Sequence, residues 1–97
     1  MSAHFVILAA DKPGALELRM ANRPDHLEYL NGLGVALKVA GPFLDPDGKS
    51  IGTMAVVAAD DLAAAQAIAD NDPYAKAGVF ASVEVRPWRV GVGGFSK

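Results

Sequence analysis

The chain has 97 residues, of which 52% are hydrophobic, with a formal net charge of −2 and no cysteine. This length fits one domain, the charge argues against a nucleic-acid-binding surface, and the lack of cysteine excludes disulfides and thiolate metal sites. No apolar run reaches the roughly 18 residues that span a bilayer, and no basic leader precedes the first apolar run. We therefore expect a cytoplasmic protein that binds neither nucleic acid nor membrane.

The beginning of the chain predicts a strand followed by a turn and a short helix. Residues 4–10 form an apolar run rich in strand formers. Residues 11–14 contain Pro and Gly and predict a turn. Residues 15–21 can form one or two helical turns.

Pro24 is expected to divide this region into two helices. A proline inside a helix removes a backbone donor, whereas a proline at the first helical position is favourable. We therefore expect a second helix that begins at Pro24, is capped by Asn22 or Arg23, and is ended by Gly32 and Gly34.

The middle of the chain predicts a hairpin and a further helix. Residues 35–44 and 51–59 are strand-like and are joined by residues 45–50, which are rich in turn formers. Asp60 or Asp61 is then expected to cap a helix that runs to residue 70.

Residues 79–88 predict the last strand. The resulting order, β-α-β-β-α-β, indicates a ferredoxin-like α+β fold with a four-stranded antiparallel sheet and helices on one face. We expect this domain to span residues 1–90. Residues 91–97 are rich in glycine and are expected to form a flexible tail.

Two of the predicted strands are apolar on both faces. Residues 5–8 and 54–57 do not alternate between apolar and polar side chains, although a sheet with one solvated face should alternate. We therefore expect the second face to pack on a copy of itself and give a homodimer. The last strand adds polar residues to one side: Ser82, Glu84 and Arg86.

One histidine is expected to point into the core. At about 100° per residue, His26 falls on the same side of its helix as Leu30 and Leu33. A buried imidazole needs a hydrogen-bonding partner. Asp72 is a candidate, because a carboxylate that fixes the imidazole tautomer creates a general base. Asp72 is also an ideal N-cap before Pro73, and the two roles are compatible.

Four further residues are candidates for substrate binding. Asp11, Arg19 and Arg23 can lie near His26 and hold an acidic or phenolic molecule, since arginine suits carboxylates. The alternative is an Arg–Asp ion pair that ties the helix to the strand. Tyr74 can donate a hydrogen bond into a pocket or simply pack. The two histidines lack metal-ligand spacing, so we expect no metal site. We also expect no organic cofactor.

These residues also carry a family resemblance. The chain resembles the YCII-related (YciI-like) family from the first strand to Trp88, with the motif residues in order and at the expected spacings. The matching positions are Asp11, Pro13, Ala15, Arg19, Arg23, His26-Leu27, Leu30, Ala40-Gly41-Pro42, Gly52, Asp72-Pro73-Tyr74, Ala77-Gly78-Val79-Phe80 and Pro87-Trp88.

The resemblance implies a dimeric α+β barrel built from ferredoxin-like subunits. It also implies an active site around a histidine–aspartate dyad, which maps onto His26 and Asp72, with Asp11 and Arg23 nearby. One branch of the family resembles dehydrochlorinases of chlorinated hydroxyquinols, and muconolactone isomerases share the wider fold.

The leading functional hypothesis is therefore a cofactor-independent lyase or isomerase that moves a proton on a phenolic, enolic or lactone substrate. His26 would move the proton, Asp72 would orient it, and Arg23 would stabilise negative charge on oxygen. The alternatives are a non-catalytic module that binds a small metabolite and an accessory or oligomerisation domain.

Overall fold

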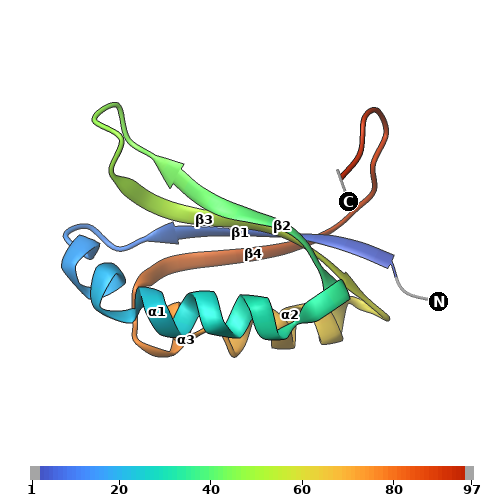
Figure 1. Ribbon diagram of the computed structural model, residues 1–97, viewed down its shortest axis with the longest axis horizontal. Coiled ribbons are helices and arrows are strands. Elements are labelled where there is room, and N and C mark those ends of the chain that lie inside the picture. The colour runs from blue at the N-terminus through green and yellow to red at the C-terminus, as the bar shows by residue number, and fades with distance from the viewer. Residues whose placement is uncertain (1–2, 96–97) are drawn as a thin grey trace.

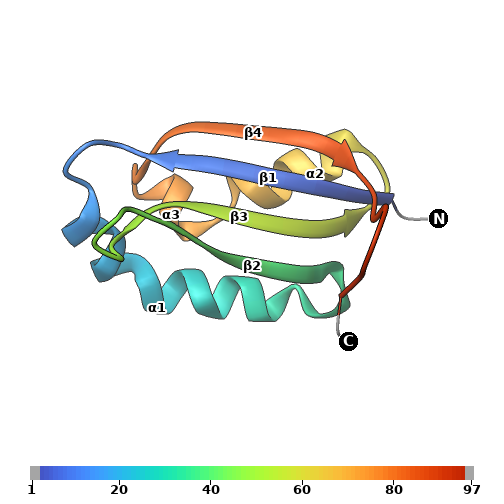
Figure 2. The ribbon, with the colours of Figure 1, turned by 90° about the horizontal axis from the view of Figure 1, so that it is seen from above.

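The computed structural model describes residues 3–95, in which one antiparallel sheet packs against helices on one of its faces (Figure 1). Its strands lie in the order β2-β3-β1-β4, as Figure 2 shows from above. The predicted fold is confirmed, with one added turn of helix, α3. The elements are β1 (Ala3–Asp11), α1 (Leu16–Gly32), a 3₁₀ turn (Gly34–Ala36), β2 (Leu37–Leu44), β3 (Ser50–Ala59), α2 (Leu62–Asp70), α3 (Pro73–Lys76) and β4 (Phe80–Trp88).

The core lies between the sheet and the helices. Alternate side chains of β1 and β3 point to the helical side, because successive residues of a strand face opposite ways. Small alanines of α2 let that helix approach the sheet closely. The buried members of this cluster are Phe5, Ile7, Ala55, Val57, Ala59, Ala65 and Ala69.

The expected helix break at Pro24 is wrong. Helix α1 is continuous over Leu16–Gly32 with Pro24 inside it, and the Asn22 side chain bonds the carbonyl of Leu18 within the helix instead of capping a new one. A proline in a helix interior costs about 3 kcal/mol. Buried side chains on both sides of Pro24, Arg19 before it and His26 after it, hold the two halves in one line.

Strands β2 and β3 form the predicted hairpin and bring Gly52 against β1. A Cβ atom built on Gly52 would lie 2.5 Å from the backbone oxygen of Ala9. Only glycine permits this approach of the two backbones. The neighbouring residue, Thr53, is thereby held on the helical side of the sheet, where it is buried.

The opposite face of the sheet carries no helix (Figure 1). Its centre is apolar, with Val6, Leu8 and Met54 half-buried and Val56 buried. At one end of the sheet, the ring of Phe95 lies 5.7 Å from that of His4 and 6.2 Å from that of Trp88. The polar residues of β4 on this face are Ser82, Glu84 and Arg86. No helix within residues 3–95 is long and apolar enough to cross a membrane.

Candidate active site

Helix α1 carries His26 on its inner side. The helical repeat places Arg19, His26 and Leu30 on the side that faces the sheet, and all three are buried. The Nδ1 atom of His26 lies 2.9 Å from Oδ1 and 3.0 Å from Oδ2 of Asp72. The two side chains, 46 positions apart in sequence, are therefore in direct hydrogen-bond contact.

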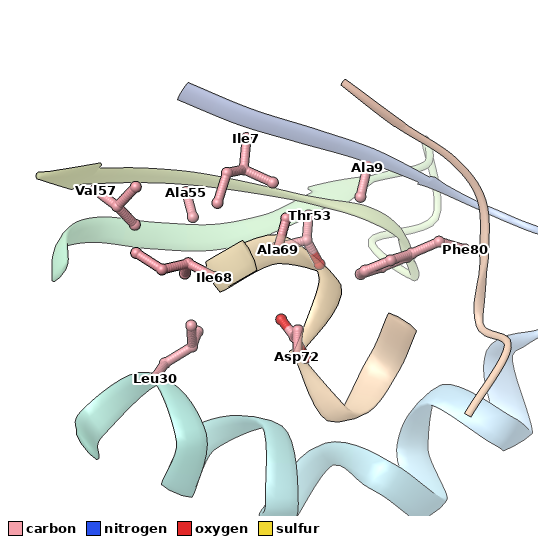
Figure 3. Close-up of a pocket in the computed structure, with 10 residues that line it drawn as sticks. All are labelled: Ile7, Ala9, Leu30, Thr53, Ala55, Val57, Ile68, Ala69, Asp72 and Phe80. Atoms are coloured by element: carbon pink, nitrogen blue, oxygen red, sulfur yellow. The ribbon is translucent and has the colours of Figure 1, made fainter. Parts of the chain in front are cut away.

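Asp72 has two roles at once. It is the N-cap of α3, where Oδ1 accepts a 2.9 Å hydrogen bond from the backbone N–H of Tyr74. The same carboxylate contacts His26, so the capping position and the contact with His26 coexist in one side chain. Asp72 also lines a small cavity of about 10 Å³ between the sheet and the helices. Figure 3 shows its carboxyl group among the other lining residues, which include Thr53 and Leu30.

This contact sets the chemistry of the His26 ring. An ionised carboxylate only accepts hydrogen bonds, so with Asp72 ionised the N–H group at Nδ1 is the donor, and a neutral His26 ring then carries its lone pair on Nε2. Within residues 3–95, no hydrogen bond is made by Nε2 and no buried side-chain nitrogen or oxygen is without a partner. It follows that Nε2 retains contact with solvent. The ring can accept a proton from a molecule that reaches this atom.

A groove of about 270 Å³ between α1 and the outer edge of β2 leads to this site. No aspartate or glutamate lines the groove, whereas two arginines do. Arg23 is exposed and makes no ion pair within the described residues. The groove therefore favours a substrate with a negatively charged oxygen. Its walls are formed by Arg19, Met20, Arg23, His26, Leu27, Leu30, Ala40, Gly41, Pro42, Ser50 and Tyr74.

Arg19 and Asp11 form a buried ion pair between α1 and β1. Nη1 of Arg19 lies 2.9 and 3.0 Å from the two carboxylate oxygens of Asp11, and Nη2 donates a 2.7 Å hydrogen bond to the hydroxyl of Thr53. Asp11 does not line the groove. This geometry is that of an ion pair that ties the helix to the strand, which was the alternative to substrate binding. Asp11 thereby neutralises the charge of Arg19 beneath the site.

Tyr74 lies under the groove and joins these two groups. Its ring stacks on His26 with centroids 3.8 Å apart and 12° between the planes. The guanidinium carbon of Arg19 also lies over the ring, 4.5 Å from its centroid. Of the six candidate residues, four line the groove, whereas Asp72 and Asp11 reach it only through His26 and Arg19.

Thr53 is the polar residue that sequence reasoning missed. It alternates with Ala55 and Val57 on the inner side of β3, so a hydroxyl in an otherwise apolar row was the available signal. The groove walls from Met20, Leu27 and Pro42 were also missed, because their position depends on how α1 packs beside β2. Within residues 3–95, no three His, Cys, Asp or Glu side chains converge to hold a metal ion.

Comparison with known sequences and structures identifies relatives over nearly the whole chain. The YCII-related domain matches residues 3–89. Protein YciI of Escherichia coli is 39% identical over 93 residues, covering 88% of this chain and 95% of that protein. An uncharacterized protein of Haemophilus influenzae is 37% identical over 94 residues, covering 89% and 96%.

Two solved structures illustrate how far the similarity reaches. The 5-chloro-2-hydroxyhydroquinone dehydrochlorinase TftG of Burkholderia phenoliruptrix, in complex with 2,5-dihydroxybenzoquinone, is similar with a TM-score of 0.83 and 33% identity over 91% of this chain and 95% of that one. A protein of unknown function from Nitrosomonas europaea gives a TM-score of 0.57 at 15% identity over 99% and 95%, and shares the fold alone.

Proposed function

Because the chain belongs to the YCII-related domain family, we propose that it is a small-molecule enzyme that transfers protons on a phenolic, enolic or lactone substrate. His26 is the general base, through Nε2. Asp72 holds its ring in the required tautomer and orientation. Arg23 stabilises the negative charge that develops on the substrate oxygen. The proposed chemistry uses only groups that this chain supplies.

One observation carries the proposal: the bond between His26 Nδ1 and Asp72. A histidine held in this way, with its second nitrogen unbonded and its side chain lining a groove, has the arrangement of a general base. A merely structural histidine in a core would have both nitrogens bonded to the protein. The groove adds the uncompensated charge of Arg23, which suits an oxyanion intermediate.

The reaction class follows from what one base can do. His26 removes a proton from a hydroxyl or an acidic C–H group, and the electron pair left behind forms an enolate or phenolate. Return of the proton to a different carbon completes an isomerisation. On a chlorinated hydroxyhydroquinone, the proton taken from one hydroxyl returns to the ring carbon that carries chlorine. His26 then removes a proton from a second hydroxyl while chloride leaves with its bonding pair, which releases HCl and leaves a quinone.

The comparison with TftG favours elimination among these outcomes. That protein is a dehydrochlorinase of a chlorinated hydroxyhydroquinone, and it is similar over 91% of this chain at 33% identity. We therefore propose chlorinated polyhydroxybenzenes as the first substrates to test, with lactones as the second class.

We also propose that a second copy of the chain covers the open face of the sheet. The apolar centre of that face, around Leu8, Met54 and Val56, has no helix over it within the described residues. A self-complementary apolar sheet face is a common way to form a twofold dimer. The polar side chains of β4 on the same face, Glu84 and Arg86 among them, would then border the buried patch.

The test of the proposed function is chloride release and quinone formation from 5-chloro-2-hydroxyhydroquinone. We expect turnover by the wild-type protein and a loss of about 100-fold or more in His26→Gln, which keeps an amide donor but has no basic nitrogen. The matched control is His4→Gln, because His4 is the second histidine of the chain and does not line the groove.

Other outcomes have distinct meanings. Turnover that survives in His26→Gln would refute the assignment of His26 as base. Saturable binding without turnover of either substrate class would favour the module that binds a small metabolite. A His26→Gln variant that fails only in folding would favour an accessory domain.

A further inference from the structure

The hydroxyl group of Tyr74 has no partner among the described residues. Tyr74 is only 1% exposed, yet no hydrogen bond within residues 3–95 involves its hydroxyl. Every buried side-chain oxygen or nitrogen of the described residues has a partner. The hydroxyl must therefore be part of the small exposed area of Tyr74, and Tyr74 lines the groove.

The second tyrosine of the chain shows the contrast. The hydroxyl of Tyr29 donates a 2.7 Å hydrogen bond to the backbone oxygen of Ile68, and Tyr29 does not line the groove. One tyrosine hydroxyl thus ties α1 to α2. The other hydroxyl makes no hydrogen bond within residues 3–95, and its residue, Tyr74, lines the groove.

The ring of Tyr74 is held firmly, so its hydroxyl occupies a fixed position. His26 stacks on the ring at 3.8 Å, Arg19 lies over it at 4.5 Å, and Phe80 meets it edge-on at 6.0 Å. Arg19 is itself fixed by Asp11 and Thr53. A donor fixed before the substrate arrives stabilises developing charge without a reorganisation cost.

The hydroxyl also keeps its proton at neutral pH. Burial is the largest cause that raises the pKa of Tyr74 above its ordinary value of 10.0. The negative charges of Asp72 and Asp11 also raise it, whereas the positive charges of Arg19 and Arg23 lower it. A neutral phenol is a hydrogen-bond donor, whereas a phenolate could only accept.

We propose that Tyr74 is a catalytic residue that donates its O–H hydrogen bond to the substrate oxyanion in the groove, together with Arg23, while His26 handles the proton. The phenol proton stays on Tyr74 throughout, so this step transfers no atom. The inference rests on the proposed function and extends it. It also defines the ligand: a molecule whose charged oxygen reaches the Tyr74 hydroxyl while an adjacent O–H or C–H reaches Nε2 of His26.

The experiment compares Tyr74→Phe with Tyr29→Phe. Each change removes one hydroxyl and retains the ring, so the stack on His26 is preserved in Tyr74→Phe. The probe is 2,5-dihydroxybenzoquinone, a quinone with two acidic hydroxyls that is bound by the TftG structure. Its binding is measured by calorimetry and by the shift of its visible absorption band, and turnover of 5-chloro-2-hydroxyhydroquinone is measured in parallel.

We expect the affinity of Tyr74→Phe for the probe to be lower by at least about tenfold, because a hydrogen bond to a charged group is lost. Its kcat should fall by more than its KM rises, since the bond strengthens as charge develops. Tyr29→Phe should bind and turn over as the wild type does.

Equal binding of the probe by Tyr74→Phe and wild type would overturn the inference, and so would failure of the wild type to bind the probe. The proposed function is judged separately by His26→Gln. Turnover that is lost in His26→Gln but unchanged in Tyr74→Phe would retain the base and reject the tyrosine donor.

Discussion

The Nδ1 atom of His26 lies 2.9 Å from Oδ1 of Asp72, and that same oxygen accepts the N–H of Tyr74. One carboxylate therefore begins helix α3 and orients a ring on helix α1. The double role means that capping and orientation can be separated only by substitutions that remove one function and keep the other.

Substitutions of Asp72 should separate these roles. Asn is as good an N-cap as Asp, so Asp72→Asn should keep α3 and lower the free energy of unfolding by less than Asp72→Ala, which also loses a cap worth about 1 kcal/mol. Both should reduce turnover by about 100-fold or more, because the His26 tautomer is no longer fixed. Urea unfolding and steady-state kinetics measure the two effects. Equal stability of the two variants would contradict the capping role.

Substitution of the two arginines of the groove should have opposite effects: one should lower stability and the other should weaken ligand binding. Arg19 is 4% exposed and paired, so Arg19→Met leaves Asp11 buried and unpaired and should destabilise the fold by about 3–5 kcal/mol. Arg23 is exposed, so Arg23→Met should change stability by less than about 0.5 kcal/mol but weaken binding of an anionic substrate. Thermal unfolding and probe binding test this reversal. A strongly destabilised Arg23→Met would show that Arg23 is structural instead.

The helical phase of α1 explains what could be predicted from the sequence and what could not. The burial of His26 and Leu30 follows from their spacing. The inner side of the helix is completed by Arg19, which the spacing of apolar residues did not indicate. A buried arginine is recognisable only when its partners are known, and Asp11 and Thr53 come from strands distant in sequence.

The strands and Pro24 show where local sequence propensity succeeds and where it fails. Local propensity predicted β1, β3 and α2 within a few residues, since their signals are continuous runs closed by turn formers. It failed at Pro24 because packing on both sides of the proline outweighs a local penalty. The groove was not predictable, since it depends on the approach of α1 to the edge of β2.

In an alkaline titration, Tyr29 and Tyr74 should both lose their hydroxyl proton at a higher pH than free tyrosine. Burial raises the pKa of Tyr29, with a further contribution from the negative charge of Asp72, and burial also raises the pKa of Tyr74. The neutral phenols are thus favoured in the folded state. Their contribution to stability is fully present below about pH 10 and is lost as pH rises through the higher folded-state pKa values.

Tyrosinate absorbance measures this titration, and Tyr29→Phe and Tyr74→Phe assign the two steps. We expect each native transition to lie above that of the unfolded chain, and the unfolding midpoint in urea to fall as pH rises beyond about 10. A tyrosine that titrates at or below its unfolded value in the native protein would contradict the burial described for it.

Light scattering at micromolar concentration should give the mass of a dimer. Met54 lies at the centre of the open sheet face, so Met54→Lys should dissociate the dimer by burying a charge. Leu62→Lys is the control, because Leu62 is exposed at the start of α2 on the other side of the sheet. A monomeric wild-type protein would refute the proposed covering of this face by a second copy.

The groove is assembled from α1, the edge of β2 and the turn that starts α3, so it exists only when the whole domain is folded. Ligand binding is therefore linked thermodynamically to global unfolding. A compound present at 100 times its Kd should stabilise the protein by about 2.7 kcal/mol. For a domain of this size, that raises the melting temperature by roughly 10–20 °C. A library of small acids and phenols can thus be screened by melting temperature alone, before any reaction is known.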